Sequence, residues 1–453
     1  MARLEEDHFP DRTDSLAVIT SQDGAIVGAQ ENIQQRVAEA LTNLDAWLQT
    51  MRQPGGFGGP VAHWWRHSLL YAGPGLDWRY EGILCGYAEL YRKTGRDVWL
   101  QRVREAVADL LDGQLAGGGL AASEFEINPG TLGTPHEAAA ILGLLDSVDC
   151  LAPDEQGRVL ELCEAVLDHL TAELWDEELR GFNDRPGIRG RVPNKLATLG
   201  EALLRFARVT GEQRYLEYAR ICLDDVVHYQ SAGEHGAIHQ YAPDADLGDG
   251  RFFPYYNARC IPGLLAGAAA FSDERYAFAA SRVAGFIRAT LADGRWPQIV
   301  YAGGRDARWP SWIAGSADIL RALYLVGDDV LGHGAMERLL CSQLPGGGFP
   351  TAEGFARRTG GRASCETPDW LDVLPVCGWN DKVLRLLAGL LSPDAPACAA
   401  TDRPAEIDVQ FYGMAAVFHE DRDVLWVRVN GRTVLHWRKG EPWLETQFRP
   451  PAL

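Results

Sequence analysis

The sequence lacks two patterns that mark large classes of protein. None of its 453 residues lie in an apolar run of about 20 residues, so no membrane-spanning helix is predicted. Lysine and arginine form no cluster, and the net charge is −19. A chain of that charge is repelled by nucleic acid and by anionic membrane surfaces, so we expect neither as a partner. A few arginines in a cleft can still bind an anionic substrate.

Motifs for metals, nucleotides and export are also missing. The nine cysteines have no CxxC spacing, which argues against a disulfide framework and a zinc knuckle. There is no HExxH or Walker motif, and PDADLGDG at 243–250 lacks two acidic ligands of a calcium loop. We therefore predict no metal and no cofactor. The N-terminus, MARLEEDHFPDR, carries acidic residues where a signal peptide has lysines, so we expect a cytoplasmic protein.

What the sequence does contain is a repeat. Its composition, 46% hydrophobic and 23% charged, is that of a globular protein. QLAGGGLAAS at 114–123 returns as QLPGGGFPTA at 343–352. The same glycine-then-apolar turn occurs six times, at intervals of 53 to 63 residues. The six copies are Gly56-Phe57, Gly119-Leu120, Gly181-Phe182, Gly236-Ala237-Ile238, Gly294-Arg295-Trp296 and Gly348-Phe349.

Two kinds of helix alternate around these turns. Before nearly every turn lies an amphipathic segment with one charged face, namely 29–51, 97–115, 154–175, 212–230 and 273–291. After each turn comes a segment rich in Gly, Ala and Leu, namely 77–95, 134–148, 193–211, 255–271, 309–327 and 378–391. This alternation predicts an all-α (α/α)6 toroid of six helical hairpins, with the apolar helices inside. The alternative is an open helical solenoid, whose repeats are shorter, roughly 34 to 47 residues.

Strands are expected only in the loops and at the C-terminus. FEI at 125–127 and AIHQY at 237–241 would form short hairpins over one end of the barrel. In the last 50 or so residues, Asn430-Gly431 separates two β-rich runs and predicts a hairpin. We expect an N-terminal extension at 1–29, the toroid at 30–391, a linker at 392–406 and a small β appendage at 407–453.

Polar residues at the start of the inner helices are the candidate site. In such a barrel these first turns meet at one rim, whereas the rest of each inner helix is too apolar to offer a site. Aromatic rings among carboxylates and amides suit a sugar, and paired carboxylates suit glycosidic cleavage. The candidate catalytic residues are Glu126, His136, Glu137, Tyr256, Arg259 and Asp381. The candidate substrate-binding residues are Trp78, Glu81, Asn194, Lys195, His239, Asn257, Trp312, Asp318, Trp379 and Asn380.

Several of these residues have a structural interpretation as well. Asn380 suits an N-cap, and Glu137 suits a capping box with Thr134. Glu201, farther along its helix, is placed to pair with Arg205. The cluster YYNAR at 255–259 suits proton abstraction beside a uronate carboxylate, which an arginine would clamp. Buried aromatic residues with an arginine that binds carbonyl groups would give the same pattern.

The chain resembles the six-hairpin glycosidase-like superfamily of (α/α)6 toroids. The resemblance covers about residues 30–391 and includes PNKLATLGEALLRFARVTGEQRYLEYA at 193–219. It implies a cleft at the inner-helix rim and glycoside hydrolysis, uronate elimination or sugar epimerisation. The QxxxGx(F/W) element is similar to repeats of terpenoid cyclases and prenyltransferases. The cyclase DxDD acid is missing, however, because LDD at 223–225 lies on an outer helix.

The sequence thus favours a carbohydrate-active enzyme that acts on a small-molecule or oligosaccharide substrate, with hydrolysis by paired carboxylates first. A uronate lyase or a sugar epimerase using Tyr256, His239 and Arg259 is the next hypothesis. A terpenoid-cyclase-like enzyme and a non-catalytic toroid that binds a glycan or peptide also stay open. Nothing in the sequence indicates an oligomeric state.

Overall fold

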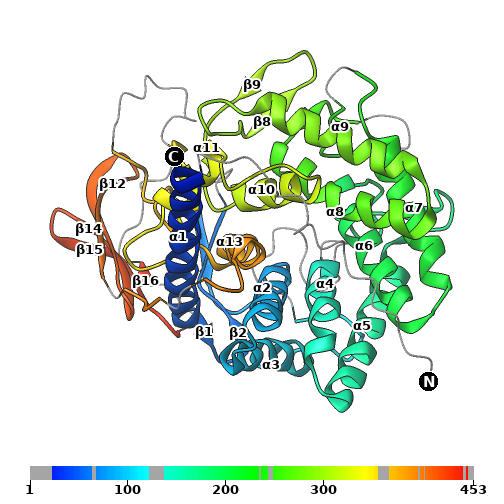
Figure 1. Ribbon diagram of the computed structural model, residues 1–453, viewed down its shortest axis with the longest axis horizontal. Helices are drawn as coiled ribbons and strands as arrows, with labels where there is room; N and C mark the ends of the chain where they lie inside the picture. Colours follow the sequence, from blue (N-terminus) through cyan, green and yellow to red (C-terminus); the bar gives the residue numbers. More distant parts are fainter. Residues whose placement is uncertain are drawn as a thin grey trace.

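An inner ring of helices surrounds the centre of the molecule (Figure 1). The computed structural model describes residues 23–63, 68–121, 137–233, 236–242, 248–355, 367–395, 398–401, 403–441 and 445–446. The inner helices are α2 (Arg79–Thr94), α4 (Ala138–Ser147), α6 (Pro193–Thr210), α8 (Pro254–Phe271), α10 (Ser316–Leu325) and α13 (Cys377–Leu390). Each one contacts the next, and α13 contacts α2, so the ring is closed.

An outer ring of helices covers the inner one. It consists of α1 (Asp23–Thr50), α3 (Asp97–Asp112), α5 (Pro153–Leu174), α7 (Arg214–His228), α9 (Glu274–Thr290) and α11 (Gly334–Cys341). The difference between the two rings follows the sequence pattern. In α3 only one stripe is buried, from Trp99 through Val103 to Leu110, whereas in α4 every residue from Ala138 to Leu145 is buried. The prediction of an (α/α)6 toroid is confirmed.

The ring closes where α2 meets α13, and glycine makes this contact possible. A Cβ atom on Gly82 would lie 2.3 Å from the carbonyl oxygen of Asp381, and one on Gly86 would lie 2.7 Å from Leu384 Cγ. Both glycines belong to α2, so the first and last inner helices approach each other more closely than larger residues would allow. The polar residues at their N-terminal ends are brought together as a result.

The two copies of the glycine motif form the same turn. Leu115 N donates to Gly119 O (2.8 Å) and Gly118 N to Leu115 O (2.9 Å). In the second copy, Leu344 N donates to Gly348 O and Gly347 N to Leu344 O, both at 2.9 Å. The middle glycine has φ of 93° in one copy and 98° in the other, a conformation that favours glycine. The repeat is therefore one of backbone structure as well as of sequence.

Short strands lie in the connections from outer to inner helices. The pairs are β1 (Arg52–Gln53) with β2 (Gly56–Phe57), β3 (Pro60–His63) with β4 (Ser68–Ala72), β5 (Trp175–Asp176) with β6 (Gly181–Phe182), and β10 (Ser311–Trp312) with β11 (Ala352–Glu353). β7 (Arg251–Phe252), β8 (Ile299–Tyr301) and β9 (Asp306–Ala307) form a three-stranded sheet. A 3-10 turn, η3 (Val148–Cys150), follows α4. The strand expected at 237–241 is only an isolated bridge between Ile238 and Gln230, and 125–127 lies outside the described residues.

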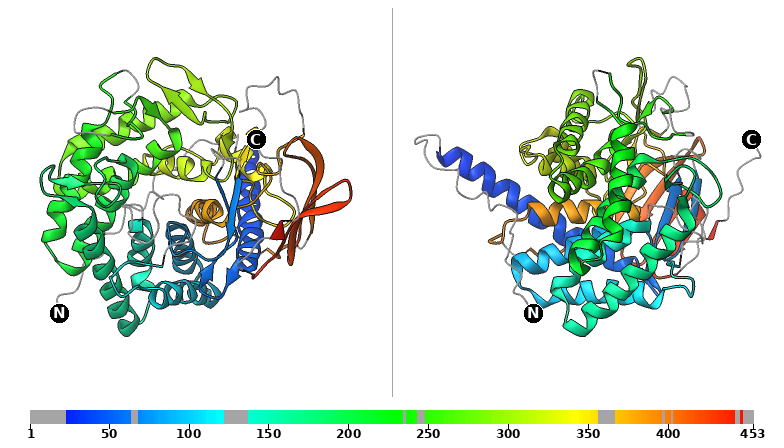
Figure 2. Two further views of the ribbon diagram at one scale, coloured as in Figure 1. Left: turned by 180° about the vertical axis from the view of Figure 1, so that it is seen from behind. Right: turned by 90° about the vertical axis from the view of Figure 1, so that its right-hand side faces the viewer.

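The C-terminal segment is an antiparallel meander beside α1 (Figures 1 and 2). Its strands are β12 (Ala405–Phe411), β13 (Met414–Glu420), β14 (Val424–Val429), β15 (Arg432–Arg438) and β16 (Glu445–Thr446). The predicted Asn430-Gly431 turn is present, with φ of 48° and 75°. β12 starts two residues before the expected boundary, and α1 starts before residue 30. Within the described helices, none has both the length and the apolar character that a bilayer crossing requires.

Candidate functional site

An aromatic cluster lies where three segments of the inner ring begin. Tyr255 comes from α8, Trp312 from β10 just before α10, and Trp379 from the first turn of α13. The ring centroids of Trp312 and Trp379 are 4.4 Å apart, and Tyr255 lies 5.1 Å from Trp379 and 5.7 Å from Trp312. Tyr256 packs edge-on against Tyr255 at 5.3 Å. Tyr255 and Trp312 are buried, whereas Trp379 and Tyr256 are half-buried.

Two carboxylates share one guanidinium next to this cluster. Arg259 Nη2 donates to Glu81 Oε2 (2.6 Å), and its Nη1 donates to Glu81 Oε1 (3.2 Å) and to Asp318 Oδ2 (3.3 Å). Tyr255 Oη donates to the same Asp318 oxygen at 3.3 Å, which links the carboxylates to the aromatic cluster. Glu81 Oε1 and Asp318 Oδ2 both accept from Arg259 Nη1, so the two carboxylates lie close together.

Glu81 is held ionised by the cations around it. Arg385 also pairs with its Oε1, and Lys382 Nζ lies 3.9 Å from its Oε2. Burial raises the pKa of Glu81, but Arg259 and Arg385 outweigh this effect, and the pKa lies well below its usual value. A carboxylate in this environment orients its arginines and does not donate a proton.

Asp381 has the opposite electrostatic environment. Its Oδ2 accepts hydrogen bonds from Lys382 Nζ (2.6 Å) and from Gly82 N (3.2 Å), and the side chain is completely buried between α2 and α13. Burial raises the pKa of Asp381 to about 8, although Lys382 acts in the other direction. Neighbouring carboxyl groups with pKa values pushed apart in this way are characteristic of acid and base pairs.

Two carboxylate oxygens in this network accept no hydrogen bond from the described part of the chain. They are Asp318 Oδ1 and Asp381 Oδ1, and both are buried. Buried acceptors nearly always have a partner, so an isolated one calls for an explanation. For Asp318, which is bonded to Tyr255 of the aromatic cluster, a hydroxyl group of a bound ligand is a suitable donor.

The structure brings seven of the predicted site residues together. They are Glu81, Tyr256, Arg259, Trp312, Asp318, Trp379 and Asp381. Trp78 adjoins them, because its indole nitrogen donates to Gly378 O (3.2 Å) and its carbonyl accepts from Lys382 Nζ (3.0 Å). Arg259 binds Glu81 and Asp318 of the chain itself through both of its Nη atoms.

Arg385 was missing from the candidate set, and Tyr255 was considered only as part of the YYNAR cluster. Arg385 lies two turns into α13, in the part of the inner helix that the sequence analysis set aside as too apolar to offer a site. Farther along α6, Glu201 pairs with Arg205 (2.7 Å) as expected, and Arg205 also binds Asp146 of α4 (3.2 Å). The signal that could have revealed Arg385 is a lone charge in an otherwise apolar helix, which requires a buried partner.

Asn257 and Asn380 bind the backbone of the glycine turns. Asn257 Oδ1 accepts from Ile238 N (2.6 Å) and its Nδ2 donates to Ile238 O (3.0 Å). Asn380 does the same with Phe349 N (2.7 Å) and Phe349 O (3.0 Å). Ile238 and Phe349 are the apolar residues of two copies of the repeat. Both amides thus have a structural role that the substrate-binding prediction did not include.

The remaining candidates lie elsewhere or outside the description. Lys195 Nζ pairs with Asp184 Oδ1 (2.8 Å) at the start of α6, next to the buried Asn194. His239 Nδ1 accepts from Gly250 N (3.0 Å), its ring packs on Phe252, and burial lowers its pKa. Glu137 is half-buried at the N-cap of α4. Glu126, His136 and Thr134 lie outside the described residues, so the roles proposed for them stay predictions.

Solved structures of several enzymes are similar in fold to this chain. Cellobiose 2-epimerase from Bacillus thermoamylovorans has a TM-score of 0.60 and 12% identity, over 78% of this chain and 98% of that one. The chain has the six-hairpin toroid fold. A heparin-specific unsaturated glucuronyl hydrolase has a TM-score of 0.55 and 13% identity, over 78% of this chain and 95% of its own.

A D-mannose isomerase is another solved structure of similar fold. Its TM-score is 0.56 at 12% identity, over 83% of this chain and 100% of its own. No protein-family model and no curated protein matches the sequence. Among the described residues of the toroid, no three His, Cys, Asp or Glu side chains are grouped so as to hold a metal ion.

Proposed function

We propose that this toroid is a carbohydrate-active enzyme that hydrolyses a glycosidic bond at the N-terminal ends of its inner helices. The observation that carries the proposal is the buried Asp318 Oδ1, which has no donor among the described residues, while Oδ2 of the same carboxylate accepts from Tyr255, a ring that packs on Trp312 and Trp379. Aromatic rings stack on the apolar face of a sugar, and a free acceptor beside them binds a hydroxyl group.

The carboxyl groups supply the two roles that glycosidic cleavage needs. One group donates a proton to the leaving oxygen, and the other acts as base or nucleophile. Asp381, whose burial raises its pKa to about 8, keeps its proton at neutral pH and is the proposed donor. Asp318 is the proposed base or nucleophile, and Glu81 positions it through Arg259.

The substrate proposed for this site is a neutral sugar. Arg259 is bound by two carboxylates of the chain itself, so it is not available to pair with the carboxylate of a uronate. The aromatic cluster needs only the apolar face of a pyranose and its hydroxyl groups. Neutral gluco- and manno-configured oligosaccharides are therefore the first substrates to test.

Epimerisation or isomerisation of a free sugar is the second candidate. Burial lowers the pKa of His239, which keeps the imidazole neutral at pH 7, and because its Nδ1 accepts from Gly250 N, the ring proton lies on Nε2, from which it can donate to a sugar oxygen. Cellobiose 2-epimerase and D-mannose isomerase are among the toroids of similar fold. In this case a proton moves between atoms of the sugar, His239 Nε2 binds a sugar oxygen, and no glycosidic bond is broken.

Two assays of one oligosaccharide panel test both candidates. Release of new reducing ends measures hydrolysis, and NMR of the recovered sugars measures epimerisation. We expect hydrolysis, with a loss of about a hundredfold or more in kcat for Asp318→Asn. Glu201→Gln is the matched control, since it breaks a buried ion pair of α6 away from the aromatic cluster. Undiminished activity of Asp318→Asn, or turnover of no panel member by the wild type, contradicts the proposal.

A further inference from the structure

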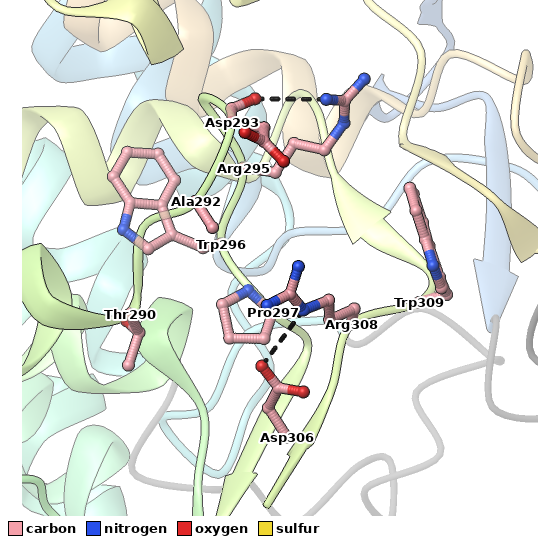
Figure 3. A pocket seen from close by; sticks show the side chains of 9 residues that line it. All are labelled: Thr290, Ala292, Asp293, Arg295, Trp296, Pro297, Asp306, Arg308 and Trp309. Atoms are coloured by element: carbon pink, nitrogen blue, oxygen red, sulfur yellow. Dashed lines mark hydrogen bonds and ion pairs between the residues drawn. The ribbon is translucent and has the colours of Figure 1, made fainter.

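A pocket lies in the connection between α9 and α10 (Figure 3). All of its lining residues belong to the stretch 290–309, which leads from the end of an outer helix to β10. They are Thr290, Ala292, Asp293, Arg295, Trp296, Pro297, Asp306, Arg308 and Trp309. None of them belongs to the aromatic and carboxylate site described above.

One wall of the pocket is the indole of Trp309. A Cβ atom on Gly354 would lie 2.4 Å from Trp309 Cε3, so only glycine allows the backbone to pack directly on this ring. The indole is half-buried as a result. Figure 3 shows it edge-on, with one face turned toward Pro297 and Arg308. An aromatic face held in this way at a pocket is a stacking surface for a flat, partly apolar ligand.

The polar groups of the pocket are of both signs. Arg308 Nε donates to Asp306 Oδ2 (3.3 Å), and both side chains are exposed. Arg295 pairs with Glu353 and donates to the carbonyl oxygen of Asp293 (3.2 Å). The lining therefore holds two arginines and two aspartates, with no excess of either charge. Such a set favours a neutral ligand with hydroxyl groups over an anion or a cation.

The pocket is joined to the aromatic cluster by three residues of chain. Trp309 lines the pocket, and Trp312 packs on Trp379 in the cluster. Three extended residues span at most about 11 Å, so the two tryptophans are within reach of a single oligosaccharide. The buried Ser311 and Trp312 pair with β11, which fixes this spacing.

We propose that this pocket is a distal subsite for a neutral oligosaccharide. One pyranose ring stacks on Trp309, and its hydroxyl groups bind Asp306 and Arg308. This inference rests on the proposed function, because it assumes that a sugar occupies the aromatic cluster. It adds that the enzyme recognises a chain of several sugars and binds longer substrates more tightly than short ones.

Calorimetric titration with ladders of one to six sugars tests the subsite. The ladders are neutral gluco-, manno- and galacto-oligosaccharides, and all proteins carry Asp318→Asn to prevent turnover. In that background we compare two variants with Tyr324→Ala. Trp309→Ala removes the indole, and Gly354→Ala displaces it. Tyr324 is an exposed aromatic residue at the far end of α10 and serves as the control. Melting temperatures verify that each variant is folded.

The expected result is a loss of chain-length preference. The ratio of Kd for the shortest bound sugar to Kd for the longest falls about tenfold in Trp309→Ala and in Gly354→Ala, and is unchanged in Tyr324→Ala. If Trp309→Ala keeps the ratio while Trp312→Ala abolishes binding, the distal subsite is wrong and the proposed function stands. If no ladder member binds the Asp318→Asn protein or the wild type, both are overturned.

Discussion

Asn257 and Asn380 occupy the fourth position of α8 and α13, and each binds both backbone groups of one turn residue. A few positions away, Arg259 and Asp381 belong to the ion network. The sequence places all four at the rim, because helix starts are easy to locate. It does not separate turn binding from substrate binding, since that depends on which loop folds against which helix.

At this scale, Asp372 gives the stability of the protein a pH dependence. Burial raises its pKa to about 7, helped by Asp369, although it accepts hydrogen bonds from Phe355 N (2.9 Å) and Asp369 N (3.1 Å). The folded state thus binds a proton that the unfolded state releases between about pH 4 and 7, so stability falls as the pH rises through this range.

Asp372→Asn should remove this pH dependence, because an amide does not titrate. Between pH 5 and pH 8 the variant should gain about 2 to 3 kcal/mol relative to the wild type. Urea unfolding at the two pH values measures the difference, and Asp408→Asn, at an exposed site on β12, is the control. Parallel stability curves for the wild type and Asp372→Asn would show that the carboxyl group is not perturbed.

For Asp381, the pH dependence is one of activity. A proton donor with a pKa of about 8 is active below that pH and loses its proton above it. We therefore expect kcat/KM for the hydrolysed sugar to fall as the pH rises through about 8. Asp381→Asn should be slow at every pH and should lack this alkaline limb. A wild-type profile that stays level from pH 6 to 10 would exclude Asp381 as the donor.

At the scale of elements, the glycine turns set the path of the chain between the rings. Gly347 has φ of 98°, and a Cβ atom there would lie 2.2 Å from Asn43 O on α1. Gly117, the first glycine of the other copy, has no atom within 4 Å of such a Cβ and no positive φ. The first and the middle glycine of the motif therefore have different roles, since only the middle one needs a positive φ and a close approach to a helix.

Gly347→Ala should therefore destabilise the protein by at least about 2 kcal/mol, because it adds both backbone strain and a steric clash. Gly117→Ala should change stability by less than about 0.5 kcal/mol. Urea unfolding of the two variants measures both values. Equal stability of the pair would mean that the turn adapts, and that the glycine repeat does not fix the outer-to-inner connection.

The helices were predictable from the sequence, and the loops between them were not. Apolar residues at helical spacing mark α3 and α7 without ambiguity, and uninterrupted apolar residues mark α4. The strand expected at 237–241 is absent because Ile238 bonds to Asn257 and Gln230 instead of to a neighbouring strand. Loop structure depends on such partners, which lie far away in the sequence.

At the scale of the whole molecule, the C-terminal sheet packs against the helical toroid. Glu420 of β13 is completely buried and accepts hydrogen bonds from Trp47 Nε1 of α1 (2.6 Å) and from Lys439 Nζ (2.9 Å). Trp370 N, which precedes α13, donates to Gln410 O of β12 (2.9 Å). The sequence predicted a small β appendage here from its change in composition, and composition carries no information about how such a segment packs.

Glu420→Gln should destabilise the protein by roughly 3 to 5 kcal/mol, because it leaves the buried Lys439 without a counter-charge. The loss should shift the unfolding transition of the whole chain, since Trp47 belongs to the outer ring. Glu406→Gln, on the exposed face of β12, is the control. Replacement of both Glu420 and Lys439 by Met should recover most of the stability. A separate early transition, with the helical signal unchanged, would mean that the sheet folds independently.

The proposed sugar site is tested most directly by a crystal structure of the wild-type protein with a neutral oligosaccharide bound under conditions of slow turnover. We expect one pyranose ring to lie against Tyr255, Trp312 and Trp379, with a hydroxyl group within hydrogen-bonding distance of Asp318 Oδ1. A sugar bound at the opposite end of the barrel, or one that leaves Asp318 without a contact, would contradict the account.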